Sequence, residues 1–425
     1  MRILQLCHGL PPESVGGVEQ HVDGLARALA AQGHDVHVFA RSSDHDRAQG
    51  ALFAQREGNP RITRAVYRWE GVRDLAGTYT CEPMAATLRA FLQAEQRAGR
   101  GFDVAHVHHL TGMSTDAVAV LREHGLPVVL TLHDYWLMCP RGQMWHQREE
   151  YCAQVEPGRC GECLHLTFGH WVSRERGPAV AAEVHERARA TIGLATRLVV
   201  PSPRVIAPFQ ALGIPPERFT VVGNGVDTGA LDAVAAPACG PGPLRLGYLG
   251  TLLPSKGLHV LLAALARLPA GTATLAIHGN AVPYHGDESF LLRCFQALRT
   301  DAGVHYHGPY SGSELPRILD AIDVLCAPAL WAEAFGLTVR EAQAAGRPVL
   351  VSAIGGLQDA IVDGREGFVL PPGDVGAWAA AIARLAADRP LARRMAAHAR
   401  PRARGFQAMA ADLVAVYADS VRSTA

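Results

Sequence analysis

The sequence predicts an α/β fold made of two doubly wound domains in tandem, and three observations lead to this prediction. The chain has 425 residues, more than one compact core usually holds. Short apolar runs alternate with segments of helical period, as in parallel sheets with helices on both faces. The runs form two series, which meet at a stretch rich in Pro, Gly and Ala, residues 234–243. We therefore expect an N-terminal domain of residues 1–220 and a C-terminal domain of residues 221–405, facing a central cleft into which both contribute loops.

The strand predictions rest on apolar runs that are each short enough for one buried strand. Helices are predicted where apolar residues recur at helical spacing and the pattern ends near glycine or proline, in residues 18–33 and 257–268. The strand runs are residues 2–8, 35–40, 103–109, 127–133 and 197–202 in the first half, and 244–250, 273–279, 304–308, 324–329, 348–353 and 367–372 in the second.

Composition excludes several classes of protein. Forty basic and forty acidic side chains give no net charge, so no overall field would gather nucleic acid. No apolar stretch reaches the roughly 18 residues of a membrane span, and the N-terminal MRILQLCHGLPP lacks a secretory signal's apolar run. We therefore expect a cytoplasmic protein. The six arginines of residues 389–404 form either a solvated helix face or a patch for peripheral contact with the inner face of the membrane.

Four of the nine cysteines, Cys139, Cys152, Cys160 and Cys163, lie in one short segment rich in glycine, proline and charge. Four thiolates suit a tetrahedral structural metal site, with zinc as the first choice and an iron–sulfur cluster as the second. We expect a polar loop with little apolar content, which metal ligation would order. The alternative is four unrelated reduced thiols, because the spacing matches no standard zinc module well.

Two glutamates, Glu333 and Glu341, flank an apolar stretch with a glycine in the run EAFGLTVRE. This pattern predicts a loop that carries Glu333, a tight entry at Gly336 and a helix from about Leu337. The N-terminus of a helix presents unpaired N–H groups and a positive dipole end, so it can hold a phosphate. The two carboxylates would not share a proton but could bind separate parts of one elongated ligand. The alternative is a solvated helix face with two unrelated glutamates.

Other residues favour an anion site beyond the strand ends. Gly16 and Gly17 open the first helix, where glycine lets a ligand approach the backbone, although a simple turn is the alternative. Lys256 lies between a strand and a helix and could reach an anion as a point charge, although a surface lysine is the commoner arrangement. Several histidines also follow strands, and of these we expect His133 to lie in the cleft and most others in the core. These histidines are His8, His106, His108, His109 and His133.

Taken together, these stretches resemble the family 4 retaining glycosyltransferases of the GT-B fold. The resemblance covers nearly the whole chain and is most specific in EAFGLTVRE with the AAGRPVL that follows. The GT-B fold consists of two Rossmann-like domains, and the segment 406–425 resembles the terminal helix that packs back on the first of them. The matching segments are GGVEQHV, FDVAHVH, LTLHD, VVGNGVD, GTLLPSKGLHVLL, EAFGLTVREAQAAGRPVLVS and GGLQDAIVDGREGFVLPPGD.

The resemblance implies a donor site for a nucleotide-diphosphate sugar. Glu333 would hold hydroxyls of the donor sugar, and Glu341 would bind the ribose of the nucleotide. Lys256 would bind phosphate. Thr251 stands where the family has an arginine five residues before this lysine, so one phosphate cation is missing.

The resemblance also assigns residues that contact the donor through the backbone or from the first domain. Backbone amides near Phe335, Gly336 and Leu337 would meet the sugar and the distal phosphate. His133 would lie near the reacting sugar, which makes His133, Lys256 and Glu333 the candidate catalytic residues. Gly16 and Gly17 would approach the phosphate from the other side, and the backbone of His307 and Gly308 would recognise the base.

The implied activity is transfer of a sugar to a glycan, lipid-linked or small-molecule acceptor, in polysaccharide biosynthesis, with no catalytic cofactor. The departing phosphate would take the proton of the acceptor. Alternatives are a nucleotide-sugar epimerase or phosphorylase of the same fold, and a non-catalytic, metal-stabilised binding module. A nicotinamide-dependent oxidoreductase is disfavoured because GxGxxG follows neither domain's first strand.

Overall fold

The computed structural model describes residues 1–237, 240–298 and 303–424, and it divides the chain into two units. Unit 1 comprises residues 1–148, residues 152–225 and the C-terminal segment from Phe406. Unit 2 comprises residues 149–151 and 226–405. The stretch at which the two series of strand runs meet, residues 234–243, belongs to unit 2, and its residues 238 and 239 lie outside the described part of the chain.

Unit 1 contains an eight-stranded sheet in the order β10-β9-β6-β5-β1-β2-β4-β3. All of its pairings are parallel except that of β3 with β4. The five strand runs predicted in the first half are confirmed as β1 (Arg2–Cys7), β2 (Asp35–Ser42), β5 (Val104–Val107), β6 (Val128–Thr131) and β9 (Arg197–Val200). The sequence prediction missed β3 (Leu52–Arg56), β4 (Arg61–Val66) and β10 (Phe219–Val221).

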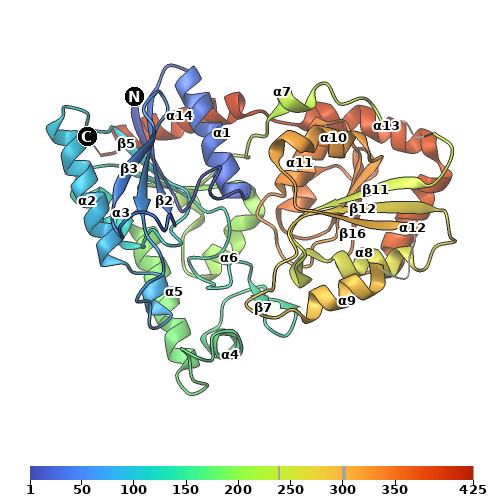
Figure 1. Ribbon diagram of the computed structural model, residues 1–425, viewed down its shortest axis with the longest axis horizontal. Coiled ribbons are helices and arrows are strands. Elements are labelled where there is room, and N and C mark those ends of the chain that lie inside the picture. Colours follow the sequence, from blue (N-terminus) through green and yellow to red (C-terminus); the bar gives the residue numbers. More distant parts are fainter. Residues whose placement is uncertain (238–239, 299–302, 425) are drawn as a thin grey trace. The chain divides into compact units, whose positions relative to one another are not determined.

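Helices cover both faces of this sheet (Figure 1), as a buried parallel sheet requires. On one face lie α1 and α14, which pack against each other so closely that a Cβ on Gly24 would lie 2.3 Å from the ring of Phe406. The other face is covered by α2, α3 and α5. The helices of unit 1 are α1 (Gly17–Ala31), α2 (Glu82–Arg97), α3 (Asp116–Glu123), α4 (Pro157–Thr167), α5 (Gly177–Leu194), α6 (Ile206–Ala211) and α14 (Phe406–Arg422).

Unit 2 contains a six-stranded, all-parallel sheet in the order β13-β12-β11-β14-β15-β16. The six strand runs predicted in the second half are confirmed as β11 (Leu244–Leu249), β12 (Ala273–His278), β13 (Val304–Gly308), β14 (Val324–Ala327), β15 (Val349–Ser352) and β16 (Gly367–Leu370). The short strands β7 (Trp145–His146) and β8 (Glu150–Tyr151) lie outside both large sheets.

The helices of unit 2 also lie on both faces of its sheet, with α8 and α9 on one side and α10 and α11 on the other (Figure 1). The predicted helix at residues 257–268 is confirmed as α8 (Leu258–Leu265). The others are α7 (Thr228–Leu231), α9 (Ser289–Leu298), α10 (Leu315–Asp320), α11 (Leu337–Ala344), α12 (Val375–Ala387) and α13 (Arg389–Ala399).

The arginine-rich stretch 389–404 is tied into unit 2 rather than freely solvated along its length. Arg389 donates to the carbonyl of Gly242, and Arg400 donates to the carbonyls of Asp232 and Val234. These guanidinium groups therefore connect α13 and the turn after it to the first segment of unit 2. In the described part of the chain, no helix is both long and apolar enough to cross a bilayer.

Gly257, between Lys256 and α8, is predicted to be intolerant of a side chain. Its φ is +74°, and a Cβ there would lie 1.9 Å from the carbonyl oxygen of Pro328. Gly257→Ala should therefore lower the free energy of unfolding by more than the about 1–2 kcal/mol of left-handed strain alone. Gly271 is a matched control, because its φ is +79° and its Cβ would meet nothing within 4 Å. Urea unfolding of the two alanine variants checks this, and equal losses would contradict it.

Candidate active site

The prediction of a helix that starts at the glycine of EAFGLTVRE is confirmed. Strand β14 ends at Ala327, a loop carries Glu333, and α11 begins at Leu337. Gly336 precedes the helix with φ +75° and ψ +69°, a left-handed conformation that glycine adopts without strain. A Cβ at this position would also lie 2.4 Å from the side chain of Leu357, so only glycine fits this entry.

The N-terminus of α11 offers free hydrogen-bond donors. The amides of Phe335, Gly336 and Leu337 donate to no acceptor in the described part of the chain. The Gly336 carbonyl, in contrast, accepts from Val339 and Arg340 and closes the first turn. Unpaired amides and the positive end of the helix dipole together form a site for an anion.

Lys256 and Glu333 lie beside each other at this end of the unit 2 sheet. Lys256 Nζ lies 2.5 Å from Glu333 Oε1, and the lysine also lies over the ring of Trp331, 5.3 Å from its centroid. The loop of Glu333 is held by a second contact, since its carbonyl accepts from the Gly356 amide at 2.6 Å. The structure therefore brings together the lysine and the first glutamate that the sequence singled out.

The carboxylate of Glu341, in contrast, has no hydrogen-bond partner among the described residues. This residue lies on α11, partly buried, and no described residue donates a hydrogen bond to its carboxylate. Burial raises the pKa of Glu341 to about 7, because the charged form loses solvation. Tyr310 is near enough that its own pKa is raised by burial and then by the charge of Glu341. A carboxylate left unpaired and desolvated in this way is available to accept hydrogen bonds from a ligand.

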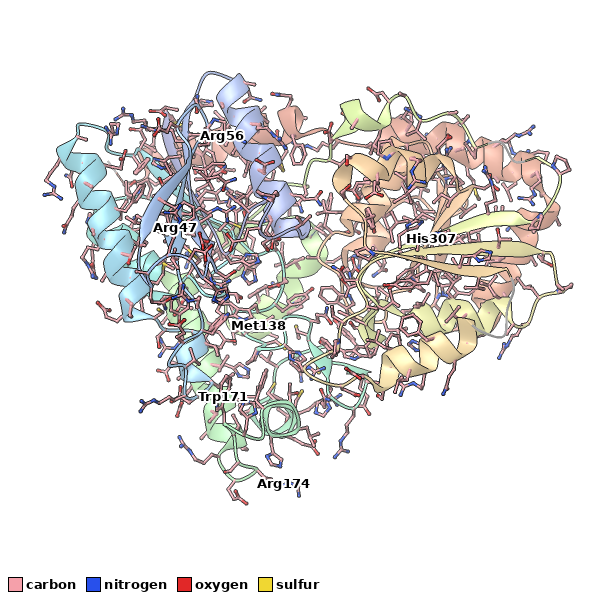
Figure 2. All side chains as sticks on the ribbon, viewed as in Figure 1. Arg47, Arg56, Met138, Trp171, Arg174 and His307 are labelled. Carbon is pink, nitrogen blue, oxygen red and sulfur yellow. The ribbon has the colours of Figure 1, made fainter. Side chains whose placement is uncertain are left out.

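The residues predicted to recognise a base lie at the end of β13. His307 stacks on His278 with ring centroids 4.6 Å apart, and Figure 2 labels it at this sheet. The carbonyl of Gly308 accepts from the Gly279 amide at 2.8 Å, which joins the ends of β12 and β13. Thr251, in the loop after β11, accepts a hydrogen bond from Tyr248 at its carbonyl and adds no charge to that loop.

In unit 1 the glycine pair is confirmed at the start of α1, but the adjacent space is occupied. A Cβ on Gly16 would lie 2.6 Å from Glu19 Oε2, so the carboxylate of Glu19 lies over this helix end. Burial opposes the charge of Glu19, but hydrogen bonding and attraction from His8, together with the Ser14 hydroxyl, lower its pKa to about 2. An anion that approaches Gly16 and Gly17 would therefore meet an ionised carboxylate.

The predicted histidines form one cluster at the carboxyl edge of the unit 1 sheet, although His106 lies within β5 and does not follow it. His106 and His108 are almost fully buried, and His133 is partly buried. His133 Nε2 lies 3.2 Å from His108 Nδ1, and its ring meets that of His21 edge-on at 4.6 Å. The sequence prediction missed His21, which projects from α1; the signal available was its position in GGVEQHV on the buried face of an amphipathic helix.

The four cysteines of the predicted metal segment line one pocket. The expectation of an irregular polar loop is wrong for part of it, because Cys160 and Cys163 lie in α4, where the CxxC spacing places them one turn apart. Backbone amides point at three of the sulfurs. Glu156 N–H donates to Cys160 Sγ, Gln147 N–H donates to Cys163 Sγ, and the amides of Arg141 and Met144 donate to Cys139.

The possible ligand atoms of the histidines, however, lie closer together than the sulfurs of the four cysteines. Among the described residues, the one group of three or more His, Cys, Asp or Glu side chains with ligand atoms all within 4.8 Å is His21, His108 and His133. The four sulfurs share a pocket but do not form such a group.

Comparison with known proteins agrees with this architecture. The family described as "Glycosyltransferase Family 4" matches residues 15–230, and the one described as "Glycosyl transferases group 1" matches residues 239–402. A glycogen synthase from Mycobacterium tuberculosis (strain ATCC 25618 / H37Rv) is 30% identical over 425 residues, which cover 95% of this chain and 90% of that protein.

Two solved structures share the fold. Sucrose-phosphate synthase from Thermosynechococcus elongatus aligns with a TM-score of 0.70 and 22% identity over 99% of each chain. HepE from Anabaena aligns with a TM-score of 0.66 and 18% identity over 99% of this chain and 100% of that one. The fold and the family matches define a glycosyltransferase of the GT-B type. Within that class, the chain belongs to glycosyltransferase family 4, as its sequence resemblance predicted.

Proposed function

We propose that this glycosyltransferase transfers a sugar from a nucleotide-diphosphate donor to a glycan, lipid-linked or small-molecule acceptor, with retention of anomeric configuration. The group of unpaired polar atoms around α11 carries the proposal: three free amides and Lys256 suit a diphosphate, and the unpaired Glu341 suits ribose hydroxyls. HepE was solved in complex with UDP and glucose, which supports a nucleotide donor. The relative named glycogen synthase supports a glycan as acceptor.

The ion pair of Lys256 and Glu333 explains how the site would respond to a donor. Breaking a glycosyl–phosphate bond builds negative charge on the leaving phosphate, which Lys256 and the α11 amides would stabilise. A bound diphosphate would compete with Glu333 for the lysine, so the carboxylate would be released to accept hydrogen bonds from the sugar hydroxyls. The departing phosphate would take the acceptor's proton. Because Thr251 is neutral, neutralisation of the diphosphate would rest on these amides and Lys256.

The remaining roles are proposed on the resemblance. The backbone of His307 and Gly308 would contact the base. His133 would lie against the reacting sugar, and Gly16 and Gly17 against the phosphate. The carboxylate of Glu19 over the start of α1 would have to move or pair with a cation for a phosphate to reach that helix end. Peripheral contact with a membrane stays a prediction from the arginine-rich stretch 389–404.

The function is tested with a donor screen followed by product analysis. Thermal-shift measurements with UDP-, GDP- and ADP-sugars should show stabilisation by one base, and proton NMR of the product should show the donor's anomeric configuration. An inverted product would overturn retention. Donor epimerised without an acceptor, or a sugar phosphate formed from inorganic phosphate, would instead establish an epimerase or a phosphorylase.

We also propose that Cys139, Cys152, Cys160 and Cys163 hold a structural metal, with zinc first and an iron–sulfur cluster second. Burial raises the pKa of Cys139 and Cys160, and the amide-to-sulfur hydrogen bonds oppose this by favouring the thiolate, the form that binds metal. Ligation would draw the four sulfurs of the shared pocket to within bonding distance of one ion.

Replacing Cys160 and Cys163 together with serine is expected to lower the metal content by one equivalent per chain and to lower the melting temperature, because the ion stabilises the folded segment. Elemental analysis and thermal denaturation measure both quantities. Cys294→Ser is a matched control, since Cys294 is buried in unit 2 and does not line this pocket. Unchanged metal content in the double variant would contradict the proposal.

A further inference from the structure

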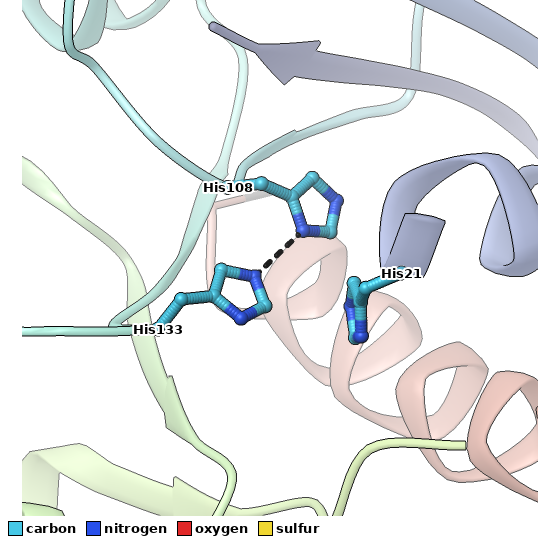
Figure 3. A group of neighbouring side chains, drawn as sticks. All are labelled: His21, His108 and His133. Carbon is cyan, nitrogen blue, oxygen red and sulfur yellow. Dashed lines mark hydrogen bonds between the residues drawn. The ribbon is translucent and has the colours of Figure 1, made fainter. Parts of the chain in front are cut away.

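Three imidazoles converge at the carboxyl edge of the unit 1 sheet, as Figure 3 shows. His21 projects from α1, His108 follows β5, and His133 follows β6. In open parallel sheets this edge is where ligands bind. His108 and His133 also line a small pocket.

The spacing of the ring nitrogens fits a metal ion. The three ligand nitrogens all lie within 4.8 Å of one another, and His108 Nδ1 lies 3.2 Å from His133 Nε2. A tetrahedral zinc with Zn–N bonds of about 2.0–2.1 Å would hold two such nitrogens roughly 3.3–3.4 Å apart. The distance between His108 Nδ1 and His133 Nε2 is therefore already close to the distance that a cation bound to both would set.

The hydrogen-bond state of these rings also calls for a ligand. Both ring nitrogens of His21 and the Nε2 of His108 are buried without a hydrogen-bond partner in the part of the chain that the structure describes. A neutral imidazole has one donor and one acceptor nitrogen, and buried polar atoms are normally satisfied. A cation bound to the lone pairs would satisfy one nitrogen of His21. On His108 and His133 it would take Nδ1 and Nε2, the two nitrogens that face each other.

The neighbouring histidines are, by contrast, already engaged. His106 bonds Tyr417 at 2.6 Å and Thr131 at 2.7 Å, so both of its nitrogens are used. His8 faces Glu19, and His109 faces Asp134, each at 3.3 Å. The unsatisfied nitrogens of this cluster are thus on two of the three converging rings, whereas Glu19 and Asp134 face His8 and His109.

We propose that His21, His108 and His133 bind one divalent cation of the zinc class through neutral imidazole nitrogens. Three nitrogen donors select borderline metals such as Zn²⁺ or Co²⁺ over Mg²⁺ and Ca²⁺, which prefer oxygen. Coordination of His133 through its Nε2 leaves the Nδ1 of the same ring for other contacts. The site shares His133 with the proposed transfer site, but metal binding is measured without turnover, so the failure of one proposal is distinguishable from the failure of the other.

Cobalt titration separates this site from the cysteine pocket. Full-length protein carrying Cys160→Ser and Cys163→Ser is stripped with a chelator and titrated with Co²⁺ and then Zn²⁺. We expect one cobalt per chain with visible ligand-field bands and no thiolate-to-cobalt charge-transfer band, then displacement by zinc. Adding His21→Leu should weaken binding by more than the about 10–100-fold that loss of an outer-sphere partner costs. His109→Gln, next to a ligand but not one of the three, should bind as the parent does.

Absence of cobalt binding in the serine background would overturn the proposal, as would equal affinity in the His21→Leu variant. If that variant fails to fold, His108→Gln replaces it. X-ray absorption at the zinc edge of the serine-background protein needs no histidine variant. Three imidazole ligands would support the site, and a shell without imidazole would reject it.

Discussion

Replacing Glu333 with glutamine is expected to reduce turnover by roughly 100- to 1,000-fold, the range found when one preorganised stabilising group is removed from an active site. Glutamine keeps the length of the side chain but loses the charge that pairs with Lys256 at 2.5 Å. It would also hold the sugar hydroxyls less strongly in the transition state. Affinity for the nucleoside diphosphate should change far less, because the lysine stays free to bind phosphate.

Steady-state kinetics and calorimetry with the nucleotide chosen by the donor screen separate these two quantities. Glu288→Gln is the matched control, because Glu288 is an exposed carboxylate of the same unit. Its kinetics should equal those of the wild type. Wild-type turnover in Glu333→Gln would remove Glu333 from the site.

Replacing Glu341 with glutamine should have the opposite profile and weaken nucleotide binding by about 10- to 100-fold. The expectation follows from the about 1.5–3 kcal/mol of a hydrogen bond to a charged group. No described residue donates to this carboxylate, so its hydrogen bonds are left for the ribose hydroxyls. Isothermal titration calorimetry measures the loss, and an unchanged dissociation constant would contradict the assignment.

The same residue predicts a pH dependence. The pKa of Glu341 is raised from 4.5 to about 7, so the carboxylate ionises across neutral pH. Nucleotide affinity should therefore rise as pH increases through about 7 in the wild type, and this component should be absent in Glu341→Gln. Titrations at pH 6 and pH 8, flanking the raised pKa, test it.

The free energy of unfolding should depend on pH in the opposite sense to nucleotide affinity. The folded pKa of Glu341 lies above its unfolded value. The contribution of Glu341 to the free energy of unfolding is therefore fully present below pH 4.5 and is lost as pH rises through about 7. The unliganded glutamine variant should thus gain stability relative to the wild type over this window. Urea unfolding across the same window measures the difference, and a constant difference would contradict the raised pKa.

Local patterns in the sequence determined most of the strands of the two large sheets. All eleven predicted strand runs contain strands, because an apolar run between turn residues has few alternatives to a buried strand. The entry to α11 was equally local, since Gly336 needs a left-handed conformation and the helix starts at the next residue. The missed strand β3 lies at the edge of the unit 1 sheet with mostly exposed side chains, so it carries no apolar run to find.

The tertiary structure alone decided which polar groups meet and which stay unpaired. The pairing of Lys256 with Glu333 joins two loops far apart in the chain. That no described residue donates to the Glu341 carboxylate has no signature in sequence. His21, His108 and His133 come from a helix and two separate strand ends that become neighbours only when β1, β5 and β6 align. Strand and helix formation depends on residues adjacent along the chain, whereas a site depends on packing between segments that the chain itself does not connect.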